Sequence, residues 1–108
     1  MANRDWYCED VLSGKLQVKL IWEDKRVLAF HHPKPADGVH AVIIPKDHVS
    51  SIMDPLAIDG KLLKSMVKAV QKVVTQTGLD TAGFFVRTNA LAPGVTPHMH
   101  WHVMTFDE

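Results

Sequence analysis

The sequence predicts an α+β domain: a five-stranded antiparallel sheet with one long helix packed on one face and a short helix at the N-terminus. Three observations predict it. Five short runs of β-forming residues are separated by turns rich in glycine, proline and aspartate. One longer segment repeats apolar residues at the three- and four-residue spacing of a helix. The chain has 108 residues, and we expect residues 1–108 to form a single domain.

The N-terminal segment predicts a short helix followed by a β-hairpin. Asp5 is a suitable N-cap, and Gly14 is a suitable end for that helix. Residues 18–23 and 26–31 are rich in β-forming side chains, so both are predicted strands. The two intervening residues, 24–25, predict a tight turn between them.

Three further strands follow from the same signals. Residues 39–44 form an apolar run that a proline ends, and residues 83–88 and 99–105 complete the predicted sheet. Two prolines and a glycine within residues 32–38 predict a loop. Residues 89–97 are expected to be the loop between the last two strands.

The long helix is predicted from caps and periodicity together. Asp54 is placed to cap it, Pro55 suits its first turn, and Gly78 suits its end. Its core-facing stripe is expected to consist of Leu62, Leu63, Met66, Val67, Val70, Val73 and Val74.

Composition excludes several functional classes. Twelve basic and twelve acidic residues leave a net charge of zero with the seven histidines neutral, so we expect no nucleic-acid polymer as partner. No apolar run reaches membrane-spanning or signal-peptide length, so no membrane association is expected. The single cysteine, Cys8, excludes an internal disulfide and suits a reducing compartment. A cytoplasmic location is the expectation that follows.

Three histidines alternate along the last predicted strand. Because successive strand side chains point to opposite faces, His98, His100 and His102 should share one face at a spacing of roughly 7 Å. We expect this row to be exposed along a groove. The intervening residues should seal the core under the long helix; they are Met99, Trp101 and Val103.

A row of imidazoles suits phosphoryl chemistry. Neutral imidazole is a nucleophile near neutral pH, and its protonated form can contact a phosphoryl oxygen. Metal binding is the second interpretation, because histidines two apart on a strand can chelate zinc with a third ligand from His40 or His48. No cysteine pair or nearby carboxylate completes such a set, so the sequence favours phosphate chemistry without a metal or other cofactor.

The order of residues 98–104 resembles the signature of the histidine triad (HIT) proteins. Residues 28–31 are similar to the second-strand segment of that family. Residues 39–48 are similar to its strand ending in Pro-Lys-x-His, and Asn89 stands where the family usually has an asparagine. The resemblance extends over almost the whole chain, and the small nucleotide-binding branch of the family is the most similar.

The resemblance implies a nucleotide phosphohydrolase, phosphoramidase or nucleotidyl transferase acting at an α-phosphate. By analogy, His100 would attack phosphorus and form a nucleotidyl-histidine. His102 would contact phosphoryl oxygens, and His98 with His40 would orient groups and relay protons. Asn89 would help to position the substrate, which is expected to be a purine nucleotide or nucleotide conjugate.

The resemblance also implies a nucleotide pocket. The base would lie against Tyr7, Val11 and Phe30. The rest of the pocket would comprise His32, where the family usually has an acidic residue for the ribose hydroxyls, Asn89, and the loop residues Gly94, Val95 and Thr96. The family usually has a hydroxyl group near Val95, where Thr96 is the nearest substitute.

Two further expectations follow from the resemblance. Family members of this size commonly form homodimers, so we expect a homodimer. Some relatives bind structural zinc through two N-terminal cysteines and two histidines, but only Cys8 is present, so no metal site is expected. The alternative to an enzyme of this class is a nucleotide-binding protein with little turnover, which His32 and Val95 motivate.

Overall fold

The computed structural model describes residues 5, 7–32, 38–93 and 95–105. A short π-type helix, η1 (Tyr7–Leu12), comes first, and the largest helix is α1 (Gly60–Thr77). A 3₁₀ turn, η2 (Pro55–Ile58), precedes α1, and a single helical turn, α2 (Leu79–Ala82), follows it. The strands are β1 (Leu20–Glu23), β2 (Val27–His31), β3 (His40–Pro45), β4 (Phe84–Thr88) and β5 (Trp101–Thr105).

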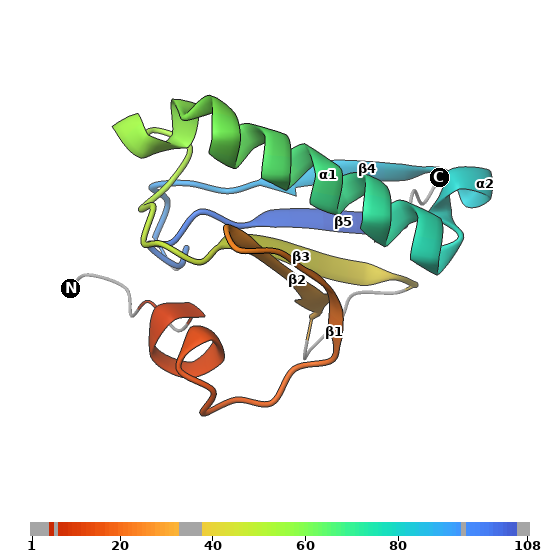
Figure 1. Ribbon diagram of the computed structural model, residues 1–108, viewed down its shortest axis with the longest axis horizontal. Coiled ribbons are helices and arrows are strands. Elements are labelled where there is room, and N and C mark those ends of the chain that lie inside the picture. Colours follow the sequence, from red (N-terminus) through yellow and green to blue (C-terminus); the bar gives the residue numbers. More distant parts are fainter. Residues whose placement is uncertain (1–4, 6, 33–37, 94, 106–108) are drawn as a thin grey trace.

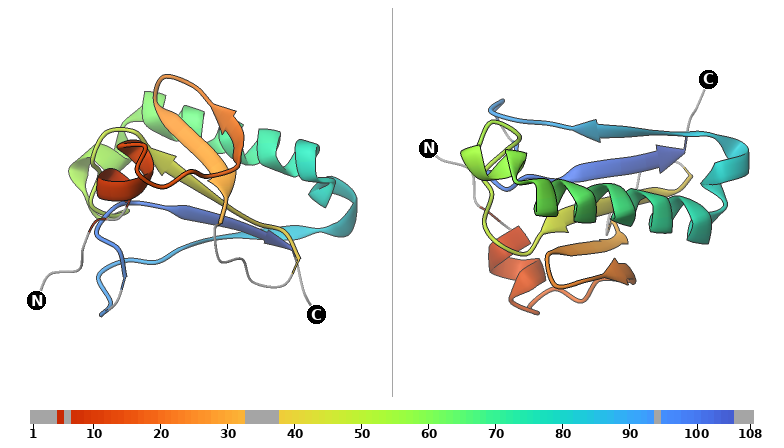
Figure 2. Two further views of the ribbon diagram at one scale, coloured as in Figure 1. Left: turned by 90° about the horizontal axis from the view of Figure 1, so that it is seen from below. Right: turned by 45° about the horizontal axis from the view of Figure 1, so that its top comes forward.

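The strands form one antiparallel sheet in the order β1-β2-β3-β5-β4. This confirms the predicted α+β class and its five-stranded sheet. The histidine-bearing strand β5 lies between β3 and β4, with Val42 opposite His102 on one side and Arg87 opposite His102 on the other. Figure 2 shows β4 at one edge of the sheet and the β1–β2 hairpin at the other.

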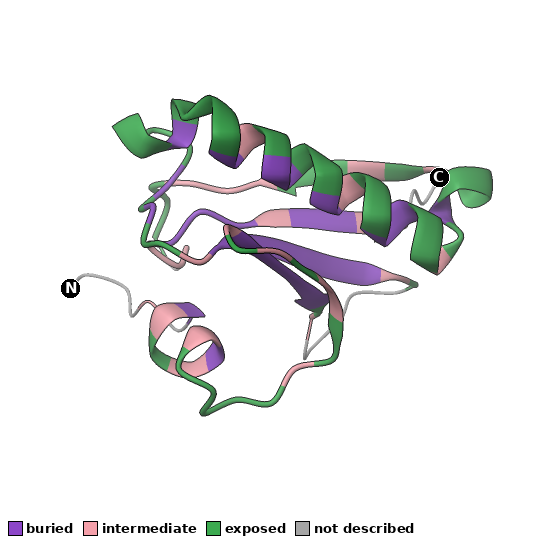
Figure 3. Cartoon of the chain, viewed as in Figure 1, coloured by how far each residue is buried: buried purple, intermediate pink, exposed green. Residues whose placement is uncertain are grey.

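Helices cover both faces of the sheet, α1 on one and η1 on the other (Figure 1). Under α1 lies the larger core, in which Ala41, Ile43 and Val103 from the sheet join Met66 and Val73 from the helix. Figure 3 shows that the central strands are largely buried, whereas the outward side of α1 is exposed.

The smaller core lies on the opposite face, under η1. Tyr7 and Val11 from η1 pack there with Phe30 from β2 and with Val42 from β3. Successive side chains of a strand point to opposite faces of the sheet. Phe30 and Val42 therefore face η1, because the residues next to them in β2 and β3 face α1. The face that carries the histidines is therefore covered in part by the N-terminal helix.

The predicted long helix is two helices, which corrects its expected start. Asp54 caps only η2, where its side chain accepts a hydrogen bond from the Leu56 amide. Asp59 then adopts extended backbone, with φ −60° and ψ 121°, and caps α1 through the Lys61 amide. Two competing N-caps five residues apart explain the interruption. Gly78 ends α1 as predicted, in the left-handed conformation with φ 79°.

Smaller differences from the sequence-based expectations lie at element ends. β1 begins at Leu20 rather than at residue 18, and β5 begins at Trp101 rather than at residue 99. The turn α2 occupies residues that had no predicted element. The hairpin turn is held by Asp24, whose carboxylate accepts hydrogen bonds from the amides of Arg26 and Val27 at 2.7 and 2.9 Å. Within the described part of the chain, no helix has the length and apolar character needed to cross a bilayer.

Candidate functional site: a buried histidine cluster

His98, His100 and His102 lie in one row, as predicted, but they are buried rather than exposed. Their exposed fractions are 0%, 5% and 7%. The expectation of an open row is wrong because Tyr7 of η1 packs over it, with its ring centroid 5.2 Å from that of His100 and 5.8 Å from that of His98. A contact between residue 7 and residues 98–100, just before the last strand, is long-range in sequence, and no local pattern predicts it.

The tautomer of His100 follows from its hydrogen bond. Its Nδ1 lies 2.7 Å from the carbonyl oxygen of His98. A carbonyl oxygen only accepts, so Nδ1 carries the proton and donates it. In the neutral ring Nε2 therefore holds the lone pair. Burial lowers the pKa of His100, which favours this neutral form near pH 7.

His40 and His102 form a hydrogen-bonded pair beside His100. Nε2 of His40 lies 2.8 Å from Nδ1 of His102, so one of the two rings donates and the other accepts. Burial is the main cause that lowers the pKa of His40 to about 4 and that of His102 to about 3. The positive charge of Arg87 acts in the same direction on both. Both rings are therefore neutral at pH 7.

His98 is held by a backbone carbonyl at the end of β3 and by the N-terminal segment. Its Nε2 donates to the carbonyl oxygen of Pro45 at 2.9 Å, and its Nδ1 lies 3.2 Å from Cys8 Sγ and 3.1 Å from an Asp5 carboxylate oxygen. Burial tends to raise the pKa of Asp5, but hydrogen bonds from the Cys8 amide and the His98 ring outweigh it, so the carboxylate is ionised. Burial, with the Asp5 carboxylate, raises the pKa of the Cys8 thiol to about 11.

The residues expected to contact a nucleotide base do come together. Tyr7, Val11 and Phe30 are at most 6% exposed, and the rings of Tyr7 and Phe30 lie 6.3 Å apart. They form a closed apolar cluster beside His100 in this conformation. Desolvation also raises the pKa of Tyr7, so its hydroxyl stays neutral.

The remaining expected nucleotide contacts lie in the loop after β2 and in the loop before β5. His32 stacks on His40, with ring centroids 4.4 Å apart and an interplanar angle of 12°. Asn89, Val95 and Thr96 are half-buried in the loop before β5, where the Thr96 carbonyl accepts from the His98 amide at 2.8 Å. Gly94 lies outside the described residues.

Sequence reasoning missed two contributors to this site. Arg87 lies directly opposite His102 in the β4–β5 pair, so both side chains are on the same face of the sheet. The guanidinium of Arg87 therefore brings a fixed positive charge to the cluster. The alternation of residues 84–88 could have placed Arg87 on that face once the strand pairing was known. Asp5 was expected to be only a helix cap, yet its carboxylate also contacts His48 at 2.7 Å and His98 at 3.1 Å.

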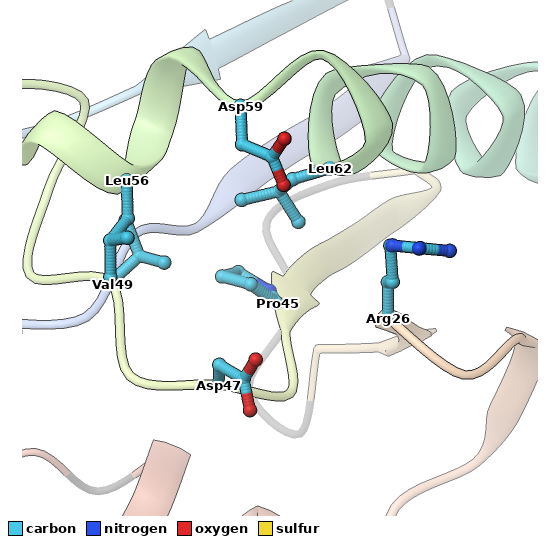
Figure 4. A pocket seen from close by; sticks show the side chains of 7 residues that line it. All are labelled: Arg26, Pro45, Asp47, Val49, Leu56, Asp59 and Leu62. Carbon is cyan, nitrogen blue, oxygen red and sulfur yellow. The ribbon is translucent and has the colours of Figure 1, made fainter.

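One described cavity lies away from this cluster, between the end of β3 and the start of α1 (Figure 4). It has a volume of about 160 Å³. It is lined by Arg26, Pro45, Asp47, Val49, Leu56, Asp59 and Leu62. None of the predicted site residues lines it, so it does not enlarge the histidine site.

A five-stranded antiparallel sheet with α1 on one face and three alternating histidines on the other defines a protein with the HIT fold. Comparisons with known proteins agree. Residues 13–108 match the family model described as HIT domain. The chain belongs to the HIT family.

Individual relatives show how extensive the similarity is. An uncharacterized HIT-like protein from Helicobacter pylori is 30% identical over 102 residues, covering 93% of this chain and 95% of that protein. A HIT family hydrolase from Legionella pneumophila superposes with a TM-score of 0.84 at 27% identity, covering 98% of this chain and 95% of that one. A HIT family hydrolase from Clostridium thermocellum gives a TM-score of 0.84 at 26% identity, covering 100% and 95%. The chain thus shares the fold of HIT hydrolases over nearly its full length.

Proposed function

We propose that this protein hydrolyses or transfers a nucleoside monophosphoryl group, by way of a nucleotide covalently attached to His100. The observation that carries the proposal is the hydrogen bond from His100 Nδ1 to the His98 carbonyl at 2.7 Å. It leaves Nε2 with a lone pair on a ring that burial keeps neutral. The fold of the two HIT family hydrolases supports the same class of reaction.

The reaction has two steps. First, His100 Nε2 forms a bond to the α-phosphorus of a phosphoramidate, ester or anhydride, and the bond to the leaving group breaks. The leaving group departs with that electron pair and takes up a proton. Water then attacks the same phosphorus, the P–N electrons return to Nε2, and a nucleoside monophosphate is released.

The neighbouring groups have separate roles in this proposal. His102 contacts phosphoryl oxygens, and the hydrogen bond between His102 and His40, 2.8 Å long, keeps the His102 ring in place. His98 orients His100 through its backbone carbonyl. Arg87, opposite His102 across the β4–β5 pair, supplies positive charge for the non-bridging oxygens.

A purine nucleotide or nucleotide conjugate is the proposed substrate. Its base would enter the cluster of Tyr7, Val11 and Phe30, with Asn89, Val95, Thr96 and His32 around the ribose and phosphate. Because that cluster is closed, base entry requires η1 to move away from Phe30. The full assembly is proposed to be a homodimer, which light scattering of the purified protein tests.

Substitution of the nucleophile is the direct experiment. We expect His100→Asn to fold and to reduce hydrolysis of an adenosine phosphoramidate by at least about 10³-fold. His31→Asn is the matched control. It is the same chemical change, and His31 is exposed at the end of β2, outside the cluster. Equal turnover by the two variants would remove His100 from the reaction.

A nucleotide-binding protein with little turnover is the second candidate. The stacking of His32 on His40, 4.4 Å between centroids, favours it because this pair fills space next to the phosphate-contacting histidines. Tight binding of a nucleoside monophosphate by the unaltered protein, with no hydrolysis of any phosphoramidate, dinucleoside polyphosphate or nucleotidyl-sugar tested, would support this candidate over the enzyme.

A further inference from the structure

A basic hollow lies between the β1–β2 turn and the first half of α1. It has a volume of about 470 Å³, and none of the proposed catalytic residues lines it. Its walls carry Asp24, Ser65 and five cations, which are Lys25, Arg26, Lys61, Lys64 and Lys68. We propose that this hollow is a second binding site, for a small molecule that carries two or more closely spaced phosphate groups.

The cations of α1 form a stripe that has no acidic partner on the same helix. Between Gly60 and Thr77 the sequence contains four lysines and neither aspartate nor glutamate. The lysines stand three or four residues apart, so they follow one side of the helix; they are Lys61, Lys64, Lys68 and Lys72. Like charges at this spacing repel one another and weaken a helix. An anion bound along the stripe would remove that repulsion.

The two carboxylates of the β1–β2 turn already have partners. Asp24 accepts hydrogen bonds from the backbone amides of its own turn at 2.7 and 2.9 Å. The Glu23 carboxylate forms an ion pair with Lys46 at 2.5 Å. Within the described part of the chain, the five cations of the basic hollow form no ion pair. The hollow therefore presents five positive charges against the single negative charge of Asp24.

Some of these charges are held in place before a ligand arrives. Lys68 Nζ lies 5.9 Å from the centroid of the Trp22 ring, and Lys72 Nζ lies 5.2 Å from it. Such cation–π contacts restrict a flexible lysine without neutralising it. Arg26 is half-buried in the turn, which also limits its motion. Because these groups are partly ordered, a ligand loses less conformational entropy on binding them.

Charge density and shape favour phosphate over other anions. A phosphate monoester concentrates nearly two negative charges and three acceptor oxygens on one centre, and the guanidinium of Arg26 can bind it through two parallel hydrogen bonds. Cations from the turn and from α1 converge on one hollow, which suits several phosphates close together. An acidic peptide would instead spread single charges along the surface. A nucleic-acid polymer is not the expected ligand, because the net charge of the chain is zero.

Lysine labelling of the unaltered protein tests where such a ligand binds. The protein is briefly acetylated with and without inorganic tripolyphosphate, and the modified lysines are quantified by mass spectrometry. Labelling of the four lysines of the basic hollow should slow several-fold, and labelling of Lys15, which is exposed after η1, should not change. No slowing at the hollow, or equal slowing at Lys15, would overturn the proposal.

Calorimetric titration with tripolyphosphate tests the charges. Lys64→Gln combined with Lys68→Gln should weaken binding about tenfold or more, because two charge-assisted contacts are lost. Hydrolysis of an adenosine phosphoramidate by this double variant should equal that of the unaltered protein. Lys15→Gln is the matched control and should bind normally. Unchanged affinity of the double variant, with binding lost in His100→Asn, would place tripolyphosphate at the histidine cluster and overturn the proposal.

Two further probes define the ligand class. Orthophosphate has a single phosphate and reaches fewer cations, so it should bind at least about tenfold more weakly than tripolyphosphate. A glutamate hexapeptide offers carboxylates of the same sign and should also bind more weakly. Equal affinity for orthophosphate and tripolyphosphate would contradict a ligand with several phosphates. Tighter binding of the glutamate peptide would show that the basic hollow receives an acidic protein segment and would overturn the assignment.

Discussion

Acidification should destabilise this protein well above the pH at which carboxylates titrate. His40 and His102 are at most 8% exposed, and burial lowers their pKa values from 6.5 to about 4 and about 3. In the unfolded chain both rings are exposed and take up protons with a pKa of 6.5. In the folded chain the two rings take up protons only at lower pH. Because the unfolded state then binds more protons, the free energy of unfolding must fall as the pH falls below 6.5.

The magnitude follows from the same values. A histidine with a pKa of 6.5 when unfolded and about 4 when folded loses about 2 kcal/mol of stability between about pH 7.5 and about pH 5. Each ring takes up its own proton when the chain unfolds, so the two rings together account for a loss of about 4 kcal/mol. Asp5, Asp24 and Asp54 have pKa values lowered below 3.8, so the stability they contribute is lost only at more acid pH.

Urea unfolding followed by tryptophan fluorescence measures the effect. With a slope of about 1–2 kcal/mol per molar urea, the midpoint should fall by roughly 2–4 M between about pH 7.5 and about pH 5. The double variant His40→Gln with His102→Gln should lose most of this dependence, and His31→Gln should retain it. A midpoint that stays constant over this range would refute the buried neutral pair.

Two further predictions concern the support of the site. Met66→Ala removes a fully buried side chain between α1 and the sheet, and it should lower the free energy of unfolding by about 2–5 kcal/mol in urea; a loss below about 1 kcal/mol would contradict the packing described for α1. Gly78→Ala places a Cβ in the left-handed conformation with open space around it, so only backbone strain acts, and the expected loss is about 1 kcal/mol. An unchanged thermal midpoint for Gly78→Ala would show that α1 ends in another conformation.

Local patterns predicted the parts of this fold that depend on neighbours in sequence. Alternation placed His98, His100 and His102 on one face, because a strand leaves each side chain only two directions. Periodicity placed Met66 and Val73 under α1. The left-handed Gly78 was predictable because few other residues end a helix in that way.

Long-range packing accounts for what was not predicted. The burial of the histidine row depends on Tyr7 crossing from the other end of the chain. The contact of Asp5 with His98 joins residues separated by 93 positions, so no local pattern could reveal it. The break between η2 and α1 arises because Asp54 and Asp59 are both suitable N-caps. The sequence alone does not show that each of them caps a helix of its own.

Mass spectrometry of a rapidly base-quenched reaction tests the role of His100 most directly. After mixing with an adenosine phosphoramidate, the peptide containing His100 should carry one adenosine monophosphoryl group, stable in base and labile in acid, and the group should disappear as turnover ends. Release of the amine with no such adduct at any time, or an adduct on His98 or His102 instead, would contradict the assignment of the nucleophile.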